Sequence, residues 1–248
     1  RPQDGGPVTV PSQDMVLGIY YLTQERPGVK GEGKFFKNVN EAILAYENGA
    51  VTLHSRVKVR VQKTMADGTV KSGIIESTVG RFIFNEIIPQ DLGFVDRSVP
   101  GNELLLEVDF HVGKKQCKQI LEKVINVHGA TQTAVTLDDI KSIGYKYSTR
   151  AAMTVSISDM TVPPSKPQLI ADAQATVDRI AKNFRRGLIT EEEWYKEVIE
   201  TWKTTDDQLT HDLLTGLDKY NNIFMMADSG ARGSDKQIKQ LAGMRGLM

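Results

Sequence analysis

The chain has 248 residues, 40% of them hydrophobic and 25% charged, which is ordinary for a globular protein with a real core. Its 31 Lys and Arg residues balance 31 Asp and Glu residues, so the overall charge points neither to nucleic acid nor to a membrane surface. The single cysteine, Cys117, excludes a disulfide framework, and no stretch resembles a signal peptide or a membrane span. We therefore expect a cytoplasmic protein.

Short helices are predicted near the N-terminus. Residues 13–23 follow Ser12, a good N-cap, and carry apolar side chains along one side. A second helix should begin after Asn38, which forms a capping-box pattern with Glu41, and should end at Gly49.

A β-hairpin is predicted next. Apolar and polar residues alternate over 53–61, which indicates a strand with one basic face. Asp67-Gly68 is a turn signal, so residues 70–79 should form the return strand. The basic face could meet nucleic acid, but a solvated surface is the favoured interpretation. The apolar run 82–88 is interpreted as a short buried helix.

Two further helices are predicted in the most basic part of the chain. The first spans 114–127 and closes at Gly129, and the second spans 137–151 with Thr136 as its cap. Seven basic residues stand against three acidic ones over 111–150. This stretch could face an anionic channel, although a solvated helix pair explains most of the lysines.

The proline-rich segment 162–167 is the best domain boundary, dividing the chain into 1–162 and 163–248. Apolar residues then recur at spacings of three and four on both sides of Gly187. The stripe comprises Leu169, Ala173, Val177, Ile180 and Phe184, then Tyr195, Val198, Ile199, Trp202, Leu209, Leu213 and Leu217. It predicts an antiparallel coiled-coil hairpin over 165–220 with helices of about 23 and 28 residues. The expected fold is thus α+β, a mixed helix and hairpin domain followed by a long helical hairpin.

The chemistry of the chain favours binding over catalysis. The hairpin carries 11 acidic and 8 basic residues, which suits protein docking better than nucleic acid. No nucleophile elbow or phosphate-binding loop is present. The histidines are scattered, without metal-ligand spacing to Cys117, at positions 54, 111, 128 and 211.

The C-terminal stretch holds a candidate anion site. Gly230 and Gly233 flank Arg232, so the backbone can reach positive φ and approach a ligand closely. Ser234 could cap the next short helix, and a cation beside a helix N-terminus suits phosphate. A solvated loop before an ordinary helix is the alternative. The apolar side of that helix is expected to be Ile238, Leu241 and Ala242.

Longer strings are more specific. Residues 225–248, MMADSGARGSDKQIKQLAGMRGLM, resemble the start of the F-loop in the β′ subunit family of bacterial DNA-directed RNA polymerase. Residues 11–23, PSQDMVLGIYYLT, resemble that family's segment just after its catalytic loop. Shorter strings at 45–49, 78–81 and 187–190 fall between them in the family's order. The resemblance covers essentially the whole chain.

The resemblance implies part of a secondary channel, through which nucleotides reach the active centre. Residues 1–162 would be pore-like and 163–248 funnel-like, with rim helices at about 165–220 and the F-loop start at about 225–248. The family's magnesium-binding aspartates and its zinc site match nothing in this sequence. We therefore expect no catalytic residue and no cofactor in the chain, magnesium and zinc belonging to the intact subunit.

The resemblance also implies ligands. Arg232 matches the family arginine that contacts the phosphates of the incoming nucleoside triphosphate, and Gln237 matches a polar residue facing the same site. Gln13 and Asp14 match positions near the catalytic loop, although helix capping explains them nearly as well. The implied partners are the beta, alpha and omega subunits, a sigma factor, transcript-cleavage factors and other channel regulators, with DNA and RNA in the intact enzyme and no membrane.

A non-enzymatic coiled-coil adaptor is the alternative from another class. An adaptor would have no use for a Gly/Ser/Arg loop followed by an apolar ending. The chain also starts at Arg1 without a methionine and stops without a polar tail, so we expect a piece of a longer protein. These features favour the polymerase interpretation.

Overall fold

The computed structural model describes residues 6–64 and 68–246, and its helices and small sheet confirm the α+β class. The chain divides into two compact units. The first comprises the described residues up to Met153 together with Asp228–Ala231, and the second comprises the rest. The division falls before the proline-rich segment at which the sequence placed it.

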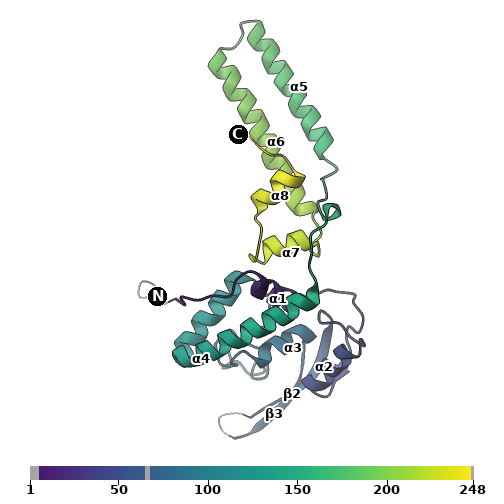
Figure 1. Cartoon of the computed structure of the whole chain (residues 1–248), viewed down its shortest axis with the longest axis vertical. Coiled ribbons are helices and arrows are strands. Elements are labelled where there is room, and N and C mark those ends of the chain that lie inside the picture. The colour runs from purple at the N-terminus through teal and green to yellow at the C-terminus, as the bar shows by residue number, and fades with distance from the viewer. Residues whose placement is uncertain (1–5, 65–67, 247–248) are drawn as a thin grey trace. The chain divides into compact units, whose positions relative to one another are not determined.

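The first unit is built from helices around a small sheet (Figure 1). Its elements are α1 (Asp14–Thr23), β1 (Phe35–Phe36), α2 (Val39–Glu47), β2 (Arg56–Thr64), β3 (Val70–Thr78), α3 (Val79–Glu86) and α4 (Lys114–Ala151). The strand order is β1-β2-β3, with β1 parallel to β2 and β2 antiparallel to β3. The predicted hairpin is confirmed, although Asp67 of its turn lies outside the described residues.

The sheet buries the face that the alternation predicted. Val57 and Val59 are 0% exposed, whereas Lys58 and Arg60 between them are exposed. Helix α3 follows β3 directly, and the Thr78 hydroxyl caps it by accepting from Arg81 N at 3.2 Å. The short buried helix expected in this stretch is confirmed.

Helix α1 packs closely on α4. Val16, Ile19 and Leu22 are 0% exposed and form the apolar side of α1. At the crossing Gly18 lies against Gly144, where a Cβ added to Gly18 would stand 1.8 Å from the Gly144 carbonyl oxygen. Glycine is therefore required at this point, because any side chain would force the helices apart.

Two helix boundaries differ from the sequence predictions. Gln13 and not Ser12 is the N-cap of α1, because the backbone turns at Gln13 with φ 49°. Gly129 breaks α4 with φ 75° and ψ −175°, as its position suggested, but the helix resumes at once. Thr136 is therefore a buried residue inside the helix and caps nothing, so that prediction is wrong.

The second unit contains a helical hairpin and two shorter helices. Its elements are η1 (Ile157–Asp159), α5 (Lys166–Arg185), α6 (Glu191–Gly216), α7 (Asn222–Asp228) and α8 (Asp235–Ala242), with the last residue of α7 assigned to the first unit. Helices α5 and α6 run side by side after a turn at Gly187, where φ is 71° (Figure 1). The Thr190–Glu193 capping box begins α6, with Thr190 N donating to Glu193 Oε2 at 2.8 Å. The hairpin is confirmed, with helices of 20 and 26 residues.

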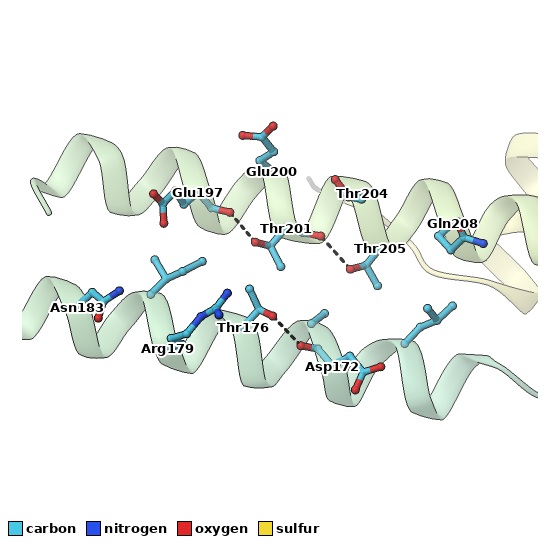
Figure 2. Close-up of a pocket in the computed structure, with 13 residues that line it drawn as sticks. Asp172, Thr176, Arg179, Asn183, Glu197, Glu200, Thr201, Thr204, Thr205 and Gln208 are labelled. Atoms are coloured by element: carbon cyan, nitrogen blue, oxygen red, sulfur yellow. Dashed lines mark hydrogen bonds between the residues drawn. The ribbon is translucent and has the colours of Figure 1, made fainter.

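The hairpin is not apolar along its whole length. Of the predicted stripe, the buried members are Ala173, Ile180, Leu209, Leu213 and Leu217. Between them α5 and α6 enclose a groove of about 790 Å³ whose lining includes Thr176, Thr201 and Thr205 (Figure 2). Tyr195 is 63% exposed and contributes nothing to the interface, so its assignment is wrong; Trp194 stacks on Phe184 instead, with ring centroids 5.4 Å apart.

Candidate functional site

The candidate anion site lies on the loop between α7 and α8. Gly230 has φ 70° and Gly233 has φ 84°, so both glycines flanking Arg232 adopt the left-handed conformation expected of them. Arg232 N donates to the Met226 carbonyl at 3.1 Å, which ties the loop back to α7. The backbone of Arg232 is therefore fixed while its side chain is exposed.

Arg232 and Gln237 line one cavity of about 400 Å³. Its other walls are mainly apolar and come from residues on either side of the 3-10 helix η1, from α7, from the loop after it and from α8: Val155, Met160, Ile223, Met226, Ala227, Gly233, Ile238, Gln240 and Leu241. Among the residues that the structure describes, no carboxylate pairs with the Arg232 guanidinium. A cation without an internal partner and an amide at one cavity suit a ligand that carries negative charge.

Helix α8 supports this cavity. Ser234 is its N-cap, as predicted, but through its backbone: the Ser234 carbonyl accepts from Gln237 N and Ile238 N at 2.9 and 3.1 Å. Ile238 and Ala242 are buried, whereas Leu241 is 69% exposed, so the expected apolar side is only partly right. Gln237 and Ile238 both line the cavity, and Ile238 also packs into the buried cluster that contains Leu213 and Leu217.

The segment just before Arg232 is anchored within the first unit. Tyr20 Oη donates to Asp228 Oδ2 at 2.7 Å, and Lys114 N donates to the Ser229 carbonyl at 2.9 Å. The His111 ring packs on Tyr20 with centroids 3.9 Å apart. Burial, and then the Asp228 hydrogen bond, raise the pKa of Tyr20 well above its usual value, so Tyr20 remains a donor.

Sequence reasoning missed this anchor. Tyr20 and Asp228 are 208 residues apart, and no sequence pattern around either residue predicts their hydrogen bond. A phenol on a predicted apolar helix face was the only local signal, because a buried tyrosine hydroxyl needs a partner.

Gln13 and Asp14 lie together at the start of α1, in the first unit. Asp14 stands in the first helical turn, where a carboxylate complements the helix dipole. Gln13 holds a strained backbone conformation, φ 49° and ψ −122°, and makes no side-chain capping bond. Gln13 and Asp14 are thus neighbours in the first unit, whereas Arg232 and Gln237 line the same cavity in the second.

Over residues 6–64 and 68–246, no three His, Cys, Asp or Glu side chains come together to hold a metal ion. Burial raises the pKa of the Cys117 thiol to about 12, so it is not a nucleophile near neutral pH. None of the described helices combines the length and apolarity that crossing a membrane requires.

The hairpin offers a different surface, at its turn. Leu188 and Tyr195 are 69% and 63% exposed there, beside an acidic first turn formed by Glu191, Glu192 and Glu193. Exposed apolar side chains rimmed by charge are typical of a protein-docking surface.

Residues in both units match known protein families. Residues 1–160 match the family described as RNA polymerase Rpb1, domain 3, and residues 189–248 match RNA polymerase Rpb1, domain 4. The whole chain is 74% identical to the DNA-directed RNA polymerase subunit beta′ of Lachnoclostridium phytofermentans, covering 20% of that protein. It is 58% and 55% identical to the corresponding subunits of Clostridium acetobutylicum and Acetivibrio thermocellus, covering 21% of each. The chain therefore spans about a fifth of the length of these relatives.

Proposed function

The chain belongs to the RNA polymerase beta′ family, and from this premise we propose that it walls the channel through which nucleoside triphosphates reach the active centre of a DNA-directed RNA polymerase. In this proposal residues 1–162 are the pore-like part and 163–248 the funnel-like part. The coiled-coil adaptor is not favoured, because the family matches extend through both units.

The observation that carries the proposal is the exposed Arg232 guanidinium beside Gln237 at one cavity. A triphosphate needs charge-assisted donors along its path, and the guanidinium offers a fork of them at a fixed backbone position. Arg232 and Gln237 are thus assigned to nucleotide phosphates. Gln13 and Asp14 are assigned to the pore-like part close to the catalytic loop.

The chain would contribute no metal ligand and no nucleophile to the nucleotidyl transfer. Magnesium would be held by another part of the subunit, as would structural zinc. The chain would act in the cytoplasm, assembled with the beta, alpha and omega subunits and a sigma factor around DNA and RNA.

The hairpin of α5 and α6 would form the rim of the channel and dock transcript-cleavage factors and other regulators. Its exposed apolar turn and acidic face support this assignment. The groove at its centre, where Thr201 donates to the Glu197 carbonyl and Thr205 to that of Thr201, forms a recess in the hairpin (Figure 2).

The nucleotide assignment is tested by Arg232→Ala in the complete enzyme. We expect the apparent KM for nucleoside triphosphates to rise about tenfold or more, since a charge-assisted contact to phosphate is lost. Lys236→Ala is the matched control, because Lys236 is an exposed cation nearby that does not line the cavity. An unchanged KM and kcat for Arg232→Ala would remove this residue from the site.

The docking assignment is tested by shortening the hairpin. Removing residues 177–204 and closing the gap with a glycine-rich turn keeps the buried Leu209 and also keeps Leu213 and Leu217, which pack in the apolar cluster at the base of the hairpin. We expect the shortened subunit to assemble with its polymerase partners but to retain no transcript-cleavage factor in a pull-down. Undiminished retention would place the docking surface elsewhere.

A further inference from the structure

The end of α8 is held by both helices of the hairpin. Lys239 Nζ pairs with Asp206 Oδ2 on α6 at 2.5 Å, and Lys166 Nζ, at the start of α5, donates to the Gly243 carbonyl at 2.9 Å. Gly243 is the C-cap of α8 and Lys239 lies in its last turn, so both contacts are made at the C-terminal end of the helix. Lysine at this end also complements the helix dipole.

The Asp206–Lys239 pair is shielded from water. The side chains of Asp206 and Lys239 are only 15% and 23% exposed. Asp206 Oδ1 is buried without a hydrogen-bond partner in the part of the chain that the structure describes, so Lys239 is the only cation that compensates this carboxylate there. A shielded pair in which one partner depends so fully on the other holds its geometry more firmly than an exposed ion pair.

Other residues of α8 line the cavity of the proposed nucleotide site. Gln237, two residues before Lys239, lines the cavity with Arg232. Ile238 lies between them and packs into the cluster that contains Leu213 and Leu217 of the hairpin base. Gln237 precedes Lys239 by two residues on this eight-residue helix, so the contacts at Lys239 constrain the part of α8 that carries Gln237 and follows the Arg232 loop.

We infer that Asp206, Lys239 and Lys166 form a positioning tether that couples the hairpin to Arg232 and Gln237. The tether makes the affinity for the nucleotide depend on the state of the hairpin, so that a protein bound to the hairpin changes nucleotide binding without touching the nucleotide. This inference rests on the proposed nucleotide role of Arg232 and adds a route of regulation to it.

The test uses the complete polymerase with Asp206→Asn and, separately, Lys239→Met. Each should raise the nucleotide KM about threefold to tenfold at nearly constant kcat, the size expected when a packed neighbour and not the contact itself is changed. Lys239→Arg and the charge-reversed pair Asp206→Lys with Lys239→Asp should return KM to within about twofold of the original, because the attraction is restored. A purely structural role would instead lower the apparent kcat through loss of assembled enzyme and leave KM unchanged.

Two matched controls accompany these variants. Asp207→Asn changes the neighbouring exposed carboxylate, and Lys236→Met changes an exposed lysine on the same helix, so both should leave KM unchanged. Amide hydrogen exchange over residues 235–242 supplies a readout independent of activity, and it should rise in the single variants and recover in the charge-reversed pair.

The outcomes separate the two ideas. If Arg232→Ala raises KM but neither tether variant does, the tether is overturned and the nucleotide role of Arg232 stands. If Arg232→Ala leaves KM unchanged, the proposed function fails, and exchange over 235–242 then decides whether the tether exists. Unchanged exchange in Asp206→Asn would overturn the tether in either case.

Discussion

Replacing Gly18 by alanine perturbs the crossing of α1 and α4 by a single methyl group. The added Cβ would stand 1.8 Å from the Gly144 carbonyl oxygen and 2.7 Å from Ser148 N, and both are backbone atoms that no rotamer change can move away. Ordinary contact begins at 3.4 Å, so α1 would have to withdraw by about 1.6 Å.

The cost of that withdrawal can be estimated. Gaps of roughly 0.5–1 Å already forfeit a quarter to a half of each dispersion contact, and Val16, Ile19 and Leu22 lose theirs together. Overpacking usually costs about 1–3 kcal/mol, and a clash with rigid backbone belongs at the upper end. We therefore expect Gly18→Ala to lower the free energy of unfolding of the first unit by about 3 kcal/mol.

The assay is amide hydrogen exchange over α1 and α4 in the 248-residue chain, with thermal unfolding followed by circular dichroism. Both tryptophans, Trp194 and Trp202, lie in α6, so their fluorescence reports on the second unit and should not change. Gly216→Ala is the control, because a Cβ there meets nothing within 4 Å and should stabilise its helix by up to about 1 kcal/mol. A loss below about 0.5 kcal/mol for Gly18→Ala would refute the reasoning.

Two further predictions concern stability. Burial lowers the pKa of His54 from 6.5 to about 4, and its Nδ1 donates to the Gln24 carbonyl at 3.1 Å, so the folded state prefers neutral imidazole. The contribution of His54 to stability should therefore be complete well above pH 6.5 and fall by up to about 3 kcal/mol as pH drops to 4, which urea unfolding at a series of pH values should show. Burial also lowers the pKa of His111, so His54→Gln should reduce the slope without abolishing it, and an undiminished slope would contradict the assignment. Leu209→Ala should cost the second unit about 2–5 kcal/mol, because this side chain is 1% exposed, whereas Leu188→Ala, at a residue 69% exposed, should cost almost nothing; tryptophan fluorescence during urea unfolding would show whether the two variants differ.

Local patterns in the sequence were sufficient for most elements. The alternation through Val57 and Val59, the capping box of Thr190 and Glu193 and the turn at Gly187 each involve residues close together in the chain. Such signals act through backbone geometry and nearest neighbours, so they survive whatever the rest of the chain does. The family strings around Arg232 were equally local.

Local patterns failed at two helix positions. Thr136 has a good capping side chain, yet it lies buried inside α4 because the helix resumes directly after Gly129. Tyr195 fits the heptad spacing, but Trp194 takes the place against Phe184, since one position around a helix rotates a side chain by about 100°. Residue spacing alone cannot show which of two adjacent residues faces the partner helix.

The sequence by itself determined the class of the fold, the hairpin, the family and the identity of the residues at the candidate site. Only the tertiary structure decided which distant side chains meet within each unit: Tyr20 donates to Asp228 across 208 residues in the first, and Asp206 pairs with Lys239 of α8 in the second. The side chains in these contacts belong to no recognisable sequence motif. The contacts are strong because folding buries them. Burial is a property of the packed chain, which is why the supporting contacts could not be predicted from the residues alone.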